Sequence, residues 1–188
     1  MKKGTLVLMA NMAGENYCRK WMLDGAMNGG LGVAAGSLPR HLSLGMPYYV
    51  KDFDAYMEFA EEFAKNFKPV TVKIKDMICA PVGPDFGGYF FVCETKDDVD
   101  GMRAMTRSAL REKLGLEVPE KDGVTGKVNI TLGFGKASYE TYKAYTDSVD
   151  KSKFVGDEVT FDEFGVFYYD EETIGANNFI CVKRIPLK

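Results

Sequence analysis

Residues 41–46 read His-Leu-Ser-Leu-Gly-Met, and residues 129–134 read Asn-Ile-Thr-Leu-Gly-Phe. The two stretches align position for position: a polar side chain, a hydroxyl two residues later, aliphatic residues between them, and then glycine. A stretch with aromatic residues at helical spacing follows each of them, at 52–67 and at 138–149. Two copies of one strand–turn–helix pattern predict an internal repeat and therefore two pseudo-symmetric halves.

The alternation within each stretch predicts where its polar side chains lie. Residues two apart on a strand share a face, so the leucines of the first stretch are expected in the core. His41 and Ser43 then point away from the core, and Asn129 and Thr131 hold the same places in the second stretch. If the halves pack about a pseudo-two-fold axis, an imidazole, a carboxamide and two hydroxyls converge.

The remaining chain alternates patterns typical of strands and of amphipathic helices. We expect helices at about 16–27, 53–67, 98–114 and 138–149, and strands at about 6–10, 70–82, 89–93, 159–169 and 178–185. Asp52 and an aspartate at 97 or 98 are expected to cap helices, and Gly115 is expected to end one. Residues 29–38 are expected to form a loop, residues 83–88 a turn and residues 170–172 an acidic hairpin turn.

These elements predict an α+β fold in one bilobal domain spanning residues 1–188. Each of its two pseudo-symmetric lobes is expected to be an antiparallel sheet covered by helices, with a cleft between the lobes.

The composition excludes several classes of function. Lys and Arg total 24 against 27 Asp and Glu, a net charge of -3, whereas proteins that bind nucleic acid non-specifically usually carry a basic excess. The chain has one histidine, so it cannot supply a two-histidine mechanism or a multi-histidine metal site by itself. Its four cysteines form no C-x-x-C motif, and no stretch approaches the ~20 apolar residues of a membrane span. We therefore expect a cytoplasmic protein that has no membrane partner and no metal or cofactor.

The paired stretches resemble the motifs of the 2H phosphoesterase superfamily, which carries a histidine and a Ser or Thr two residues apart on a strand in each half. Within that superfamily the order of elements is most similar to the 2′,5′ RNA ligase-like group of cyclic phosphodiesterases. The resemblance covers nearly the whole chain, including the lead of Phe67, Lys68 and Pro69 into an alternating strand. It implies two histidines flanking a phosphodiester or 2′,3′-cyclic phosphate, one as general base and one as general acid.

The resemblance also implies roles for the four polar residues. His41 would be one acid–base group, and the hydroxyls of Ser43 and Thr131 would hold the phosphoryl oxygens. The second histidine position holds Asn129, whose carboxamide donates hydrogen bonds but cannot carry a proton. Losing one acid–base group typically costs about 10²–10⁴ in rate.

Three further side chains are candidates for substrate contacts. Arg40 adjoins His41, and Lys127 lies two residues before Asn129 on the same face; either could contact phosphate or simply be a solvated charge. Tyr48 follows the first motif closely and is a candidate for stacking on a nucleobase.

Three functions stay open at this level. One is a 2H-type phosphoesterase-like protein that binds an RNA-end or nucleotide phosphate in the cleft and cleaves a cyclic or 2′,5′ phosphodiester weakly. The alternative is a catalytically inactive phosphate- or nucleotide-binding or regulatory module that kept the fold. An unrelated small-molecule enzyme on a similar scaffold also fits, because a fold does not fix a function. The expected partner is a small phosphate-containing ligand or an RNA terminus.

Overall fold

A computed structural model describes residues 2–31, 39–82, 87–135, 137–170 and 179–188. Its helices are α1 (Met12–Asn28), α2 (Phe53–Phe63), α3 (Val99–Leu114) and α4 (Tyr139–Ser148), with short 3-10 turns η1 (Ala64–Asn66) and η2 (Lys151–Lys153). Its strands are β1 (Lys2–Ala10), β2 (His41–Ser43), β3 (Tyr48–Tyr49), β4 (Val70–Pro81), β5 (Gly87–Glu94), β6 (Asn129–Phe134), β7 (Glu158–Asp170) and β8 (Ile180–Pro186). None of the described helices is long and apolar enough to cross a membrane.

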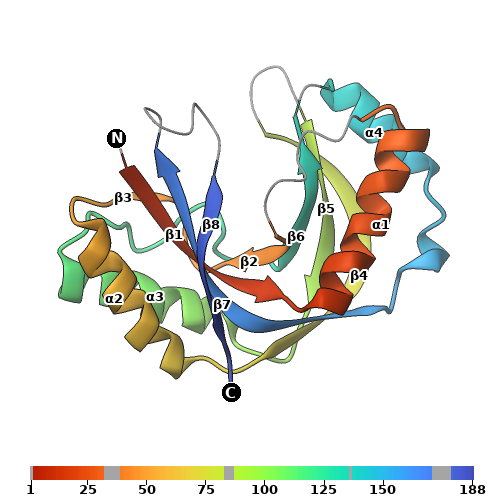
Figure 1. Ribbon diagram of the computed structural model, residues 1–188. Coiled ribbons are helices and arrows are strands. Elements are labelled where there is room, and N and C mark those ends of the chain that lie inside the picture. The colour runs from red at the N-terminus through yellow and green to blue at the C-terminus, as the bar shows by residue number, and fades with distance from the viewer. Residues whose placement is uncertain (1, 32–38, 83–86, 136, 171–178) are drawn as a thin grey trace.

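The strands form one eight-stranded sheet with the order β2-β1-β7-β4-β5-β6, to which β3 adds beside β1 and β8 beside β7. Every neighbouring pair is antiparallel. The sheet bends so far that its two end strands, β2 and β6, lie side by side in the middle of the molecule (Figure 1). The α+β prediction with antiparallel strands is thus confirmed, with one continuous sheet where two separate sheets were expected.

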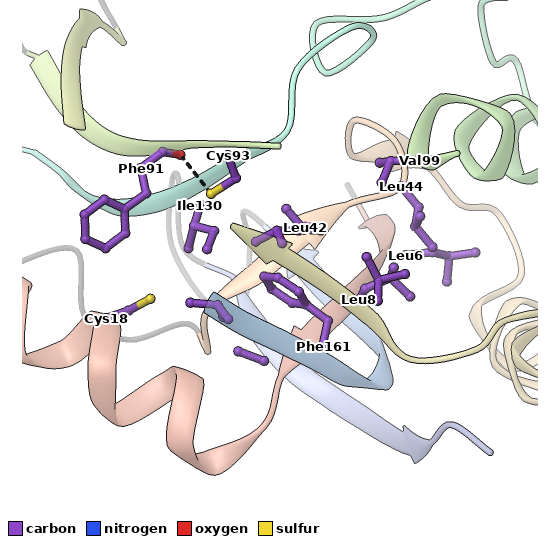
Figure 2. Packing of buried hydrophobic residues seen from close by; sticks show 14 of the residues in the cluster. Leu6, Leu8, Cys18, Leu42, Leu44, Phe91, Cys93, Val99, Ile130 and Phe161 are labelled. Carbon is purple, nitrogen blue, oxygen red and sulfur yellow. Dashed lines mark hydrogen bonds between the residues drawn. The ribbon is translucent and has the colours of Figure 1, made fainter. Parts of the chain in front are cut away.

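The helices gather in two groups on opposite sides of the molecule (Figure 1). Helices α2 and α3 lie on the side that holds β3, and α1 and α4 pack against β4, β5, β6 and β7 on the other side. Figure 2 shows Leu42 of β2 and Ile130 of β6 within the same apolar interior, to which β1 contributes Leu6 and Leu8. The core therefore runs beneath both motif strands.

Most element boundaries agree with the sequence, because caps mark them. Asp52 and Asp98 each accept a hydrogen bond from the first turn of their helix, and Gly115 ends α3 with φ 61°. Helix α1 begins earlier than expected, because the Asn11 side chain accepts from the amide of Gly14 and caps the helix there.

The strand at 41–46 is shorter than expected. After Ser43 the chain leaves the ladder for a few residues, and Tyr48 then resumes the antiparallel pairing with β1, opposite Gly4, to make the short strand β3. Three predicted stretches lie partly outside the described residues: 32–38 of the loop, 83–86 of the turn and 171–178 around the acidic hairpin.

Candidate functional site

The two motif strands are joined by a buried arginine. The Arg40 guanidinium donates from one Nη1 to the carbonyl oxygens of Thr131 and Leu132, at 2.9 and 3.0 Å. Strands β2 and β6 share no ladder of backbone hydrogen bonds, so within the described residues these side-chain bonds fix how the motifs meet. Two segments far apart in the sequence are thereby held next to each other.

The alternation that the sequence predicts is present in both strands. The aliphatic residues of the motifs are completely buried: Leu42, Leu44, Ile130 and Leu132. The polar residues between them lie on the opposite face of the sheet and are partly exposed: His41, Ser43, Asn129 and Thr131. Within the described residues no hydrogen bond engages the two hydroxyls or the carboxamide, so three polar groups on one face retain their capacity to bind a ligand.

His41 is held in one tautomer. Its Nδ1 lies 2.8 Å from the carbonyl oxygen of Pro39, and because a carbonyl only accepts, Nδ1 carries the hydrogen. The edge-on ring of Phe167, 4.7 Å away between centroids, packs against the imidazole. Burial lowers the pKa of His41 to about 4, against a raising effect of the Pro39 hydrogen bond and a further lowering by Arg40. Near neutral pH His41 is therefore uncharged, with Nε2 as a proton acceptor.

Asn129 and Thr131 are set on β6 by their pairing with β5. Asn129 lies directly opposite Val92, and Thr131 lies opposite Phe90, so each pair shares one face of the sheet. The Asn129 amide can donate a hydrogen bond to a phosphoryl oxygen, and the Thr131 hydroxyl can do the same. Together with Ser43 they make a set of neutral donors beside one base.

Comparisons with solved structures show the fold of the chain. The chain aligns with TT0787 of Thermus thermophilus at a TM-score of 0.63 and 15% identity, covering 98% of this chain and 97% of that one. It aligns with Kluyveromyces marxianus Usb1 bound to uridine monophosphate at a TM-score of 0.51 and 14% identity, covering 98% of both chains. The chain has the 2H phosphoesterase fold. No family model matches the sequence, and no curated protein matches it.

On this 2H phosphoesterase fold, sequence reasoning missed an aromatic neighbour of the site. The predicted strand at 89–93 is apolar throughout, but only alternate residues of it are buried. Phe90 and Val92 face the same side as Thr131 and are partly exposed. The period-two pattern of β6 shows which residues of its partner strand β5 lie on the same side of the sheet, once the register of the two strands is known.

Two of the further candidates lie away from the polar face. Arg40 is 3% exposed, and its guanidinium bonds the backbone of β6. It therefore makes a buried structural contact, where the sequence left open a phosphate contact or a solvated charge. Tyr48 is 8% exposed and donates from its hydroxyl to Asp122 at 2.5 Å, which leaves no open ring face for a nucleobase. Burial and this hydrogen bond raise the pKa of Tyr48.

Lys127 is exposed, in the segment that leads into β6. Its Nζ donates to the carbonyl oxygen of Gly123 at 3.1 Å, within its own loop. The described residues hold no group of three or more His, Cys, Asp or Glu side chains that could bind a metal ion.

Proposed function

We propose that this protein binds the phosphate of a nucleotide or RNA end on the joined polar face of β2 and β6. The observation that carries this proposal is the side-by-side placement of the two strands, fixed by Arg40, with three neutral donors and the Nε2 of His41 on one face. Ser43, Asn129 and Thr131 would hold the phosphoryl oxygens. Charge on a phosphate is stabilised by donors that are positioned before it arrives.

We further propose that His41 acts as general base in slow hydrolysis of a 2′,3′-cyclic phosphate. Nε2 removes a proton from water, the water oxygen bonds to phosphorus, and the bond from phosphorus to one ribose oxygen breaks. The leaving oxygen needs a proton, which Asn129 cannot supply and which must therefore come from solvent. The missing acid limits the rate.

The nucleobase is proposed to lie against Phe90. This ring is partly exposed on the face of β5, directly opposite Thr131, whereas Tyr48 is buried. Base stacking on an aromatic side chain is tolerant of base identity, so this contact favours nucleotides over free phosphate without selecting one base.

The alternative is an inactive module that binds a nucleotide phosphate without cleaving it. The specific observation that favours it is Asn129 at the second motif position in a chain whose one histidine is His41. Both functions require the same bound phosphate, so activity separates them.

Replacing Asn129 by His tests the site directly. With 2′,3′-cyclic UMP as substrate, Asn129→His is expected to raise the hydrolysis rate by about 10²–10⁴ over the parent, and adding His41→Ala should abolish the gain. Asn28→His, which adds a histidine to the end of α1, is the matched control and should change nothing. Activity in the parent that His41→Ala removes would reject the inactive module, and no gain in Asn129→His would overturn the proposed mechanism.

Binding is tested separately by titration calorimetry with UMP and with inorganic phosphate. Phe90→Ala should lower the affinity for UMP by about tenfold and leave the affinity for inorganic phosphate unchanged, since only the nucleotide has a base to stack. Tyr49→Ala removes an aromatic ring that is 56% exposed on β3 and serves as the control. Failure of the parent to bind UMP, cyclic UMP or phosphate would refute the proposed function.

A further inference from the structure

Two buried arginines reach the backbone of the two hydroxyl residues of the proposed site. Arg40 is 3% exposed and donates to the carbonyl oxygen of Thr131 at 2.9 Å. Arg103 of α3 is 2% exposed and donates from Nε to the carbonyl oxygen of Ser43 at 3.0 Å. The backbone carbonyl of each hydroxyl residue, Ser43 and Thr131, therefore accepts a hydrogen bond from a buried guanidinium.

Arg103 also connects β2 to the segment that enters β6. Its Nη1 donates to the Asp100 carboxylate at 2.9 Å, and the same carboxylate accepts from the amide of Gly126 at 3.0 Å. Gly126 lies shortly before Asn129, the first residue of β6. This chain of bonds runs from Ser43 through α3 to β6, while Arg40 makes the direct connection at the start of β2.

These contacts matter for the spacing between β2 and β6. The strand has three residues and pairs with β1 alone, so its distance from β6 is not set by a shared ladder in the described residues. A buried guanidinium is costly to desolvate unless its donors are satisfied in good geometry. Arginine fits this task better than lysine, because its planar fork presents several donors in fixed directions.

We propose that Arg40 and Arg103 are positioning residues that set the spacing between the Ser43 and Thr131 hydroxyls and thereby the affinity for phosphate. The inference rests on the proposed function. Neither arginine is assigned a contact with the ligand; both act through the backbone of the residues that make it.

The test compares Arg40→Lys and Arg103→Lys with Arg107→Lys. Arg107 lies one turn along α3 from Arg103, is 3% exposed and pairs with Asp122. Among the described residues no hydrogen bond or ion pair joins Arg107 to Ser43, Asn129 or Thr131. Hydrogen exchange of peptides spanning 39–45 and 127–134 should speed up by about tenfold in the first two variants and not in Arg107→Lys, since loss of about one hydrogen bond allows local opening. The first peptide stops before Met46, whose amide donates to Asp122, the partner of Arg107. Equal exchange in all three variants would overturn the proposal.

Binding of UMP by calorimetry supplies the second readout. At temperatures where all variants are folded, Arg40→Lys and Arg103→Lys should each lower the affinity for UMP by about tenfold. Arg107→Lys should bind UMP as the parent does. Parent-like affinity in the first two variants overturns the positioning role and leaves the proposed function standing. A parent that binds neither UMP, cyclic UMP nor inorganic phosphate refutes the proposed function, and with it the role of both arginines in binding.

Discussion

A single imidazole sets the acid sensitivity expected of this protein. Burial lowers the pKa of His41 to about 4, from an ordinary 6.5 that the unfolded chain retains. Between these values the unfolded state binds a proton that the folded state excludes, so stability is full above pH 6.5 and falls as the pH drops toward 4. The loss attributable to His41 is up to about 3 kcal/mol. Between pH 7 and pH 4.5, urea unfolding should show a larger loss of unfolding free energy for the parent than for His41→Gln. Equal losses in the two proteins would contradict the lowered pKa of His41.

At the scale of elements, β7 packs closely against β1, the strand that pairs with β2. A Cβ at Gly165 would lie 2.3 Å from Met9 Sδ and 2.7 Å from Met9 Cγ, and Met9 lies directly opposite His41. Gly165→Ala must therefore displace a fully buried side chain next to the site, at a cost of about 1–3 kcal/mol. Chemical denaturation measures this cost, and adding Met9→Val should recover part of it. UMP affinity should fall as well.

Gly115→Ala is the control for that experiment. A Cβ at Gly115 meets nothing within 4 Å, but φ is 61°, so the substitution costs about 1 kcal/mol through the backbone alone. It lies at the end of α3, and UMP affinity should be unchanged. If Gly165→Ala behaved in the same way, close packing at Met9 would not influence the site.

Elements were predictable where the signal is local. Asp98 caps the start of α3 and Gly115 ends it, because capping and positive φ depend on residues within one turn. The side of the sheet on which His41 lies follows from the period-two alternation of the strand. The role of Arg40 could not be predicted, since its acceptors lie in β6 and become neighbours only when the sheet bends. Phe90 was missed for the same reason: its relation to Thr131 depends on strand register.

The whole molecule is acidic, and this limits how it can hold RNA. Its net charge is -3, and three of its arginines, Arg40, Arg103 and Arg107, are buried within the fold and cannot follow a phosphate backbone. Binding should therefore depend on the terminal nucleotide. A ten-nucleotide RNA and the mononucleotide with the same terminal phosphate should bind within about threefold of each other, with a salt dependence near that of about one phosphate, a slope of roughly −0.7.

Fluorescence anisotropy and calorimetry across a salt series measure both quantities. A matched RNA that ends in a free hydroxyl should bind far more weakly, because the internal phosphates of the chain meet a surface without a basic excess. Affinity that grows steadily with RNA length, or a slope steeper than about −3, would mean that several phosphates are neutralised at once. In that case a basic track along the surface, and not the end-binding face of β2 and β6, would dominate recognition.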